Sequence, residues 1–289
     1  MSSTIAIKSR IRSVKSTRQI TKAMELVAAS KMRRAQEATL ASRTYAAAAR
    51  ELLTRLSQLT DVKRHPLFIK RTVKSRLIIL VTSDRGLAGA YDGNMIKLYA
   101  KELKLDRDAG ATTRTITIGR KGSNFVARLR DIETIGAYHE FPDIPDANQL
   151  SPIITLAVKL YRDQVVDAVD VIFTDYVNSL KQTPMMRRLL PAGFVESTVS
   201  HAIHTADFEP SADEVLESAT ERLIEAQLYQ TLHDARASEY SMRMIAMRNA
   251  TDNATSLVDD LTLAFNNARQ TAITQELAEI TGGAEALNG

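Results

Sequence analysis

The stretch from Ser211 to Thr281 reads SADEVLESATERLIEAQLYQTLHDARASEYSMRMIAMRNATDNATSLVDDLTLAFNNARQTAITQELAEIT and contains neither glycine nor proline. A second stretch without either residue runs from Met1 to His65. Interior glycine and proline cost a helix about 1 and 3 kcal/mol relative to alanine. At about 1.5 Å per residue, each stretch would form a rod of roughly 90 Å. Two such rods at opposite ends of one chain predict a paired shaft that carries the middle segment as a separate body. This architecture indicates a mechanical or scaffolding role.

The apolar residues of both stretches recur at helical spacing. In the N-terminal stretch, steps of 4, 3, 4 and 3 residues, typical of a coiled-coil seam, join Tyr45, Ala49, Leu52, Leu56 and Leu59. Two further apolar patches are Ile7, Ile11 and Val14, and Ile20, Met24 and Val27. The C-terminal stretch carries Leu228, Leu232, Ala235, Met242, Ala246, Ala250, Ala254, Leu257, Leu261, Ala264 and Ala268. We therefore expect an antiparallel coiled coil, made irregular by interruptions such as Arg18 and Glu239. The small side chains at Ala246, Ala250 and Ala254 predict a close approach to the first helix near Met24.

The middle of the chain alternates between strand and helix patterns. Short β-branched runs predict buried strands at Arg76–Thr82, Thr113–Ile118 and Asp170–Asp175. Helical segments are expected near Asn94–Lys104, Lys121–Arg130 and Ala147–Val166, and a hairpin is expected at Thr183-Pro184. Alternation of this kind favours a small Rossmann-like α/β domain with parallel pairing. The predicted fold class is therefore α+α/β, with an N-terminal coiled-coil helix at 1–65, a central α/β domain at 66–210 and a C-terminal coiled-coil helix at 211–289.

The composition excludes several classes of protein. The 289 residues include no cysteine, so a disulfide, a thiolate metal site and a cysteine nucleophile are all excluded. The N-terminus lacks the apolar region of a secretory signal, and its basic pattern continues into a helix with core periodicity, unlike a cleaved transit peptide. No run approaches the roughly 18 apolar residues of a membrane span. We therefore expect a soluble chain without a direct membrane span.

The charge distribution is uneven although the net charge is only +4. Nine cations against Glu25 alone lie between residues 1 and 36: Lys8, Arg10, Arg12, Lys15, Arg18, Lys22, Lys31, Arg33 and Arg34. The residues around the beginning of the C-terminal stretch are acidic instead: Glu209, Asp213, Glu214, Glu217, Glu221 and Glu225. Basic helices bind nucleic acids or acidic membrane surfaces, and an acidic protein partner is the third possibility. Composition alone does not separate the three.

Two glycine-containing loops resemble phosphate cradles. They are Ser83–Gly93, directly after the first predicted strand, and Gly119–Gly122. Neither matches the glycine-rich dinucleotide or P-loop motif. Tight turns between strand and helix need glycine whether or not a ligand binds. We therefore interpret both loops as structural.

Catalytic and metal-binding motifs are weak in this sequence. The five histidines are His65, His139, His201, His204 and His233. His201 and His204 could ligate a metal from one helix, but no convincing third ligand lies nearby, and surface histidines are the simpler interpretation. Neither a serine elbow nor a pair of catalytic carboxylates is evident. We expect no cofactor, no metal and no catalytic residue.

Specific motifs at both ends and in the middle resemble one family. The segment Ile20–Arg34 (ITKAMELVAASKMRR) strongly resembles the N-terminal helix of the gamma subunit of F-type ATP synthases. Arg243–Ala254 (RMIAMRNATDNA) and Asn267–Glu276 (NARQTAITQE) resemble its C-terminal helix. Ser83–Leu87 (SDRGL) matches the central-domain loop of the family, which then usually reads Cys-Gly-Gly where this chain has Ala88-Gly89-Ala90.

The resemblance implies the central rotor shaft of a rotary ATP synthase, a non-catalytic subunit that couples ion flow to ATP synthesis and hydrolysis. The implied partners are the alpha and beta subunits around the shaft, with the epsilon subunit and the membrane c-ring at the α/β domain. Because the match begins near Met1, we expect a bacterial protein, peripheral at the cytoplasmic face of the plasma membrane. The alternative is a coiled coil that binds nucleic acid through its basic N-terminal helix.

Candidate site residues follow from spacing and from the resemblance. Spacings of 4, 3 and 7 residues place Lys8, Arg12, Lys15 and Lys22 on one side of a helix, where they would face acidic partner surfaces. The resemblance assigns Arg269, Gln270 and Thr274 to an upper contact with the catalytic ring. Further expected contacts with the alpha/beta ring are Met24, Lys31, Arg33, Arg34 and Arg243. The candidate residues of the central-domain loop are Asp84, Arg85, Gly86 and Gly89.

Overall fold

The computed structural model describes residues 2–61, 64–143, 147–193, 203, 208–209 and 211–288. It divides into two compact units. Unit 1 comprises Met1–Ala28 and Met244–Gly289, and unit 2 comprises Ala29–Arg243. The two long helices, α1 (Ser2–Leu59) and α6 (Ala212–Asn288), each contribute to both units. Both predicted rods therefore exist as unbroken helices of 58 and 77 residues.

The long helices run antiparallel within each unit, as predicted. In unit 1, Thr21 lies beside Thr251 and Glu25 beside Arg248, so the residue number rises along one helix as it falls along the other. In unit 2, the C-terminal end of α1 packs against the N-terminal end of α6. Leu53 and Leu56 form a small apolar cluster there with Leu216, Ala219 and Leu223.

The inward face of α1 follows an unbroken alternation of three- and four-residue steps. In unit 1 the buried or half-buried positions on this face are Thr4, Ile7, Ile11, Val14, Arg18, Thr21, Glu25 and Ala28. In unit 2 they continue with Met32, Ala35, Thr39, Ser42, Ala46, Ala49, Leu53 and Leu56. This is the heptad spacing of a coiled-coil seam. Arg18 occupies one of these seam positions, so a charged side chain interrupts the apolar seam there, as predicted.

Some of the apolar residues predicted to face the partner helix are exposed instead, so this part of the prediction is wrong. Ile20 and Val27 are more than half exposed, and Leu59 and Leu257 are also exposed. The seam uses the polar side chains of Thr21 and Glu25 instead, and it passes through Leu53 and Val258. One continuous 3.5-residue period sets which side faces the partner helix, so an apolar residue out of phase with it stays outside.

Unit 2 is built on a five-stranded sheet in the order β3-β2-β1-β4-β5. The strands are β1 (Ser75–Val81), β2 (Thr112–Ile118), β3 (Glu133–Tyr138), β4 (Ala168–Tyr176) and β5 (Gln182–Leu190). The first four are parallel, and β5 pairs antiparallel with β4 at the edge. The three predicted strands are confirmed as β1, β2 and β4. The predicted hairpin is confirmed as the antiparallel pair of β4 and β5, but its turn lies at residues 177–181. Thr183 and Pro184 lie inside β5, where an edge strand tolerates a proline.

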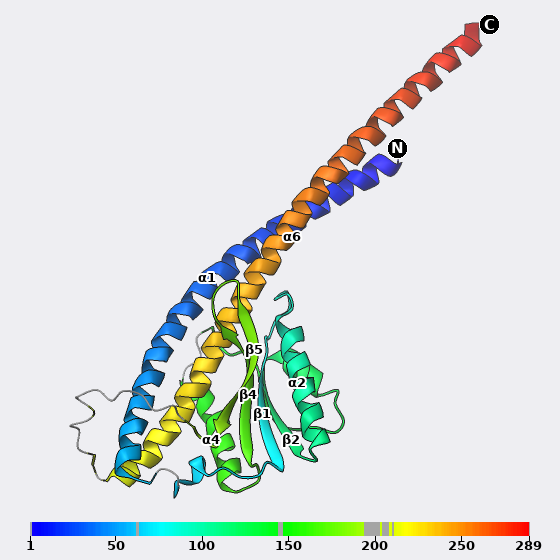
Figure 1. Cartoon of the computed structure of the whole chain (residues 1–289). Coiled ribbons are helices and arrows are strands. Elements are labelled where there is room, and N and C mark those ends of the chain that lie inside the picture. The colour runs from blue at the N-terminus through cyan, green and yellow to red at the C-terminus, as the bar shows by residue number, and fades with distance from the viewer. Residues whose placement is uncertain are drawn as a thin grey trace. The chain divides into compact units, whose positions relative to one another are not determined.

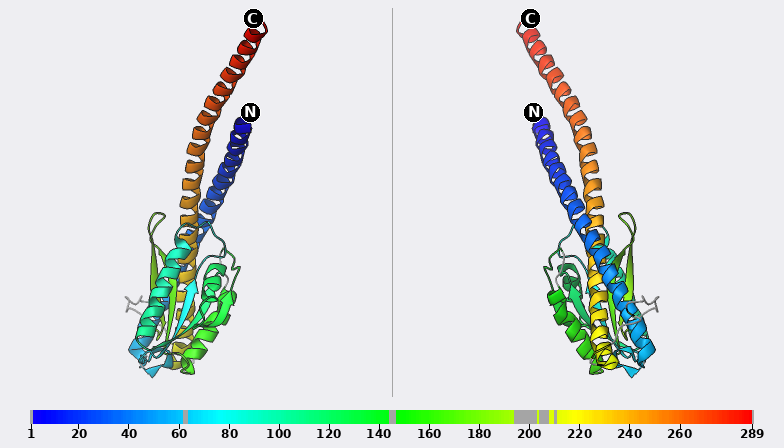
Figure 2. Two further views of the ribbon diagram at one scale, coloured as in Figure 1. Left: turned by 90° about the vertical axis from the view of Figure 1, so that its right-hand side faces the viewer. Right: turned by 90° about the vertical axis from the view of Figure 1, so that its left-hand side faces the viewer.

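Helices cover both faces of the sheet (Figures 1 and 2). One face carries α2 (Tyr91–Asp108) and α3 (Arg120–Val126), and the other carries α4 (Ala147–Arg162) and the unit 2 part of α6. A short 3₁₀ helix, η2 (Pro66–Phe68), precedes β1.

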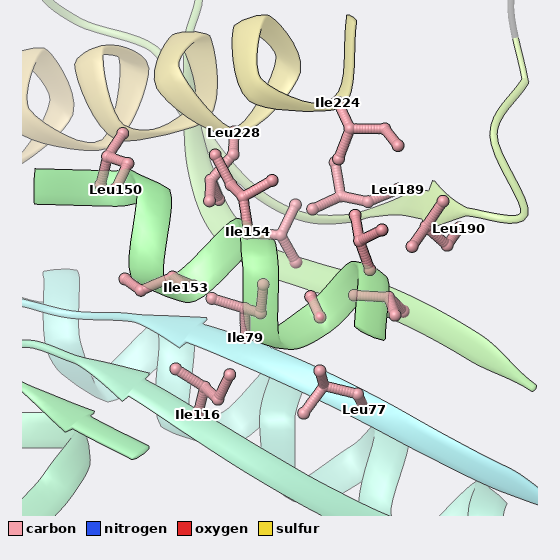
Figure 3. Packing of buried hydrophobic residues seen from close by; sticks show 14 of the residues in the cluster. Leu77, Ile79, Ile116, Leu150, Ile153, Ile154, Leu189, Leu190, Ile224 and Leu228 are labelled. Carbon is pink, nitrogen blue, oxygen red and sulfur yellow. The ribbon is translucent and has the colours of Figure 1, made fainter. Parts of the chain in front are cut away.

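The β1 strand supplies both faces of the core by alternation. Leu77, Ile79 and Val81 belong to the cluster under α4 and α6, whereas Ile78 and Leu80 belong to the cluster under α2 and α3. Figure 3 shows the larger cluster, in which Ile153 and Ile154 of α4 and Leu228 of α6 pack over Ile79 and Ile116. Because α6 contributes Ile224, Leu228 and Leu232 to the larger cluster, its unit 2 segment is part of the domain core.

Gly119 is required by the backbone at the turn between β2 and α3. Its φ of 100° is disfavoured for other residues, and a Cβ there would lie 2.2 Å from the carbonyl oxygen of Thr82. We expect Gly119→Ala to lower the free energy of unfolding by at least about 1–3 kcal/mol, from backbone strain alone. The matched control is Gly93→Ala in α2, where a Cβ meets nothing within 4 Å and helix propensity favours alanine. Urea unfolding of both variants checks this, and equal stabilities would contradict it.

Candidate functional site

The basic stripe of α1 is exposed in unit 1. Lys8, Arg12, Lys15 and Lys22 all lie outside the seam. Lys22 pairs with Glu25, with 2.9 Å between Nζ and Oε2. Among the described residues, Lys8, Arg12 and Lys15 make no ion pair within the chain, so their charges remain available to a partner.

The three residues predicted for an upper contact lie on a solvent-facing part of α6. Arg269, Gln270 and Thr274 are all exposed. The Thr274 hydroxyl donates to the Gln270 carbonyl oxygen at 3.0 Å, within the helix. In unit 1, α6 continues past the N-terminal end of α1 (Figure 1). In unit 1, α6 also exposes the apolar side chains of Leu263, Ile273, Leu277 and Ile280.

Polar contacts join the two helices of unit 1 where the family motifs meet. The Arg248 Nε donates to Glu25 Oε1 at 3.1 Å, and the hydroxyls of Thr21 and Thr251 lie 2.8 Å apart. The hydrogen bond from Lys22 lowers the pKa of Glu25, and Arg248 lowers it further. Met24 is half-buried beside this contact. The pair is therefore held in register by polar groups that a simple apolar seam would lack.

Small side chains on α6 accompany this contact. Ala254 is buried, and Ala246 and Ala250 are half-buried. We expect Ala254→Leu to lower the free energy of unfolding by about 1–3 kcal/mol, because extra volume must separate the helices. The control Ala264→Leu, on an exposed position of the same helix, should change it by less than about 0.5 kcal/mol. Urea unfolding of the isolated chain measures both, and a harmless Leu at position 254 would reject close packing there.

The remaining predicted contact residues divide into two groups. Arg33 and Arg34 are exposed on α1. Lys31 instead pairs with Asp143 in unit 2, with 3.0 Å between Nζ and Oδ2, and lies over the Tyr240 ring. Arg243 is also engaged within unit 2, as described next.

Three charged residues of α6 form one cluster on the face that meets the sheet, which we call the Arg236–Glu239–Arg243 cluster. Glu239 uses both carboxylate oxygens, accepting from Arg236 at 2.9 Å and from Arg243 at 2.8 Å. The Arg243 Nη2 donates to the carbonyl oxygens of Arg85 at 3.0 Å and Gly86 at 3.3 Å. The Arg236 Nη2 donates to the Phe141 carbonyl oxygen at 3.2 Å and lies 3.6 Å from Asp84. The side chains of the cluster are 5–11% exposed.

The central-domain loop is fixed from within the domain. Asp84 accepts the backbone N–H of Arg120 at 3.1 Å and of Glu140 at 3.2 Å, so one carboxylate joins the ends of three elements. Ser83 is bound through its N–H and its hydroxyl to Asp92. Gly89 has a φ of 59°, a backbone conformation that glycine adopts more readily than residues with a Cβ. Arg85 and Gly86 contribute backbone carbonyls to the cluster.

The N–H groups that would bind a phosphate at Gly119–Gly122 already have partners. The N–H of Arg120 donates to Asp84, that of Lys121 to the Ser83 carbonyl, and that of Gly122 to the Thr82 hydroxyl. In parallel sheets of this kind, ligands bind beyond the carboxyl ends of the strands, where the strand order reverses. Here charged side chains of α6 bind the loop after β1. The geometry supports the structural interpretation of both loops.

Sequence reasoning missed a polar segment in the interior. Every residue of α6 from Thr231 to Ser241 is buried. Within the described residues, both ring nitrogens of His233 and both carboxylate oxygens of Asp234 have no hydrogen-bond partner. Arg43 approaches Asp234 to 3.6 Å. Burial lowers the pKa of His233 to about 4 and raises the pKa of Asp234 to about 6. No motif marks these two residues.

The interpretation of the histidines as surface residues is wrong for His65 and His233, which are buried. It holds for His139, and His201 and His204 lie outside the described residues. Within the described ranges, no group of three or more histidine, aspartate and glutamate side chains is placed to hold a metal ion. Every helix in those ranges falls short of the length and apolarity that a membrane crossing needs.

Known proteins resemble this chain over its whole length. The family model described as ATP synthase matches residues 3–287. The ATP synthase gamma chain of Moorella thermoacetica is 41% identical over 283 residues, covering 97% of this chain and 98% of that protein. The gamma chain of Chloroflexus aurantiacus is 42% identical over 291 residues, covering 99% of both.

Two solved structures share the fold. A chain of the Euglena gracilis mitochondrial ATP synthase matches with a TM-score of 0.70 and 16% identity, over 99% of this chain and 95% of that one. A chain of the central stalk and c-ring of the Tetrahymena thermophila mitochondrial ATP synthase matches with a TM-score of 0.61 and 23% identity, over 80% of this chain and 99% of that one. Identity near 40% over almost the full length, with the same two-helix and α/β architecture, leads to one assignment: the chain belongs to the ATP synthase gamma chain family.

Proposed function

We propose that this chain is the central rotor subunit of a rotary ATP synthase and couples ion flow to ATP synthesis and hydrolysis. The observation that carries the proposal is the near-complete match to gamma chains at about 40% identity. In this proposal residues 1–65 and 211–289 form the shaft, and residues 66–210 form the body that meets the membrane sector. Nothing in the comparisons favours the nucleic-acid-binding alternative.

The proposed partners divide between the two units. The alpha and beta subunits surround the helices of unit 1, where the exposed groups Lys8, Arg12, Lys15 and Lys22 and the tip residues Arg269, Gln270 and Thr274 lie. Met24 in unit 1 and Lys31, Arg33, Arg34 and Arg243 in unit 2 complete the set of proposed contacts with the alpha and beta subunits. The epsilon subunit and the c-ring bind unit 2. The complex lies at the cytoplasmic face of a bacterial plasma membrane, with this chain as a peripheral subunit.

The shaft itself catalyses no reaction in this proposal, and ATP chemistry belongs to the surrounding subunits. A rotor acts by presenting different faces to catalytic sites that are otherwise equivalent. Unit 1 has such an asymmetry: α1 exposes the basic stripe, whereas α6 exposes Asp252, Asp259 and Asp260. Rotation would exchange these faces, and each exchange shifts a site's conformational equilibrium by the difference in contact free energy.

Co-expression with the alpha and beta subunits of the same organism tests the assignment. We expect the chain to co-purify with them and, once joined to the membrane sector, to support ATP-driven proton pumping. Retention on DNA at moderate salt without binding to alpha and beta would instead favour the alternative, since nucleic-acid binding by a basic helix weakens steeply with salt.

The basic stripe provides a sharper prediction within the same assay. Reversing Lys8, Arg12, Lys15 and Lys22 to Glu should weaken assembly or pumping, although each exposed pair contributes only about 0–1 kcal/mol. The matched control exchanges Lys for Arg and Arg for Lys at the same four positions and retains every charge. Normal pumping by the reversed variant at low salt would show that the stripe is only a solvated face.

A further inference from the structure

We propose that the Arg236–Glu239–Arg243 cluster is the torque-bearing joint that fixes the rotational angle of α6 about its own axis against the central sheet. This inference rests on the proposed rotor function and adds positioning residues to it. The joint consists of the cluster on one side and, on the other, the loops that follow β1 and β3.

The cluster holds α6 from two directions. Arg243 donates to the carbonyl oxygens of Arg85 and Gly86, in the loop after β1. Arg236 donates to the carbonyl oxygen of Phe141, in the segment after β3. Glu239 lies between them and binds both guanidinium groups, so neither arginine moves without the other. The three residues lie seven positions apart at most and therefore share one face of the helix.

The receiving loops are tied to each other as well as to the helix. Asp84 lies 3.6 Å from Arg236 and accepts N–H groups from Arg120 and Glu140, which belong to α3 and to the segment after β3. Asp143, two residues beyond Phe141, binds both Tyr240 of α6 and Lys31 of α1. The same edge of the domain thus holds both long helices.

Directional bonds suit a joint that resists twisting. Side-chain atoms of a helix lie about 5–6 Å from its axis, so a rotation of about 20° would displace them by roughly 2 Å. That displacement breaks hydrogen bonds of about 3 Å, which weaken steeply as they lengthen and bend. Because the cluster is buried, broken bonds would leave charges without water to replace the lost partners. Apolar packing lacks this dependence on direction.

A purely structural role is the competing explanation, and the two differ in what they predict for coupling. If the cluster only stabilises the fold, its removal lowers the melting temperature and leaves the number of protons pumped per ATP unchanged in the complexes that assemble. If it bears torque, the ratio of ATP-driven pumping to ATP hydrolysis falls in assembled complexes.

The experiment measures this ratio in membrane vesicles containing the intact complex, with the content of assembled complex measured in parallel. The variants are Arg236→Met and Arg243→Met, with Arg243→Lys as the rescue variant because lysine still donates to the loop carbonyls. The matched control is Arg222→Met, which removes an exposed arginine of the same helix that pairs with Glu225. We expect the ratio to fall at least twofold in both Met variants, to recover by more than half in Arg243→Lys and to be unchanged in the control.

Each outcome decides a different claim. An unchanged ratio in both Met variants would overturn the joint, whatever the melting temperature. If the Met variants do not assemble, Asp84→Asn decides by the same ratio, because it removes the charge that lies 3.6 Å from Arg236, and a wild-type ratio in this variant would equally overturn the joint. Absence of pumping with the unsubstituted chain, despite the presence of its partners, would contradict the rotor function itself.

Discussion

Arg76→Met should lower the free energy of unfolding of the chain by about 3–5 kcal/mol, because one buried guanidinium holds three carboxylates. Arg76 lies 2.8 Å from Asp106, 3.2 Å from Glu102 and 3.4 Å from Asp170, and its side chain is 7% exposed. Of the three carboxylates, Asp170 alone has a second cation within the described part of the chain, and this is Arg188 at 2.5 Å. Removal of Arg76 therefore leaves two poorly hydrated carboxylates without a charge partner.

Arg107→Met is the matched control for this substitution. Arg107 lies on the same helix as Glu102 and Asp106, but its pair with Asp131 is solvent-exposed on both sides. A loss of no more than about 1 kcal/mol is expected there. Urea unfolding at pH 7 measures both variants. A comparable loss at the two positions would contradict the account of the Arg76 network.

The second large effect concerns His233 and Asp234, whose contributions to stability oppose each other with pH. The folded-state pKa of Asp234, raised by burial to about 6, lies above its ordinary value. Its contribution to stability is therefore present at low pH and is lost as pH rises from about 4 to about 6. The folded-state pKa of His233, lowered by burial to about 4, lies below its ordinary value. Its contribution is lost as pH falls from about 6.5 to about 4. Each amounts to about 3 kcal/mol.

Single substitutions should reveal each contribution. Asp234→Asn removes one titration, so its stability should fall more steeply than that of the unsubstituted chain as pH is lowered from 6.5 to 4. In His233→Leu the stability should fall less steeply, or rise, over the same pH range. The double variant should regain the pH dependence of the unsubstituted chain. The charged groups around Asp234 are Arg43 of α1, Asp175 of β4 and Arg187 of β5, and all are kept.

Urea unfolding at intervals of half a pH unit gives these slopes. The comparison uses differences between variants, so the other titrating groups of the chain cancel. Parallel curves for all four proteins would show that neither side chain titrates with the perturbed pKa.

The long helices could be predicted from sequence because the absence of glycine and proline is a local property. The strands β1, β2 and β4 could be predicted for a similar reason, since each is a short β-branched run ended by turn residues. The residues that form the seam between the long helices were harder to predict. Ile20 and Val27 are apolar but exposed, whereas Thr21 and Glu25 face inward. Which side of a helix is buried depends on its partner over many turns, and a short window of sequence does not contain that information.

The candidate site divides in the same way. Exposure of Lys8, Arg12 and Arg269 follows from their place on a helix, and the structure agrees with it. The engagement of Arg243 with the loop after β1 could not be predicted, because the two lie more than 150 residues apart in sequence. The burial of His233 and Asp234 was also unpredictable, since a helix enclosed on all sides shows no amphipathic period.

The central claim is that this chain rotates, and single-molecule observation tests it most directly. Because the sequence has no cysteine, Lys104→Cys creates a unique attachment point on an exposed position of α2 in unit 2. A bead fixed there reports motion of the chain within an alpha/beta complex held on a surface. The account predicts that ATP drives continuous rotation of the bead in one direction, and that removal of ATP stops it. A complex that hydrolyses ATP while the bead shows only random angular fluctuation would contradict the account.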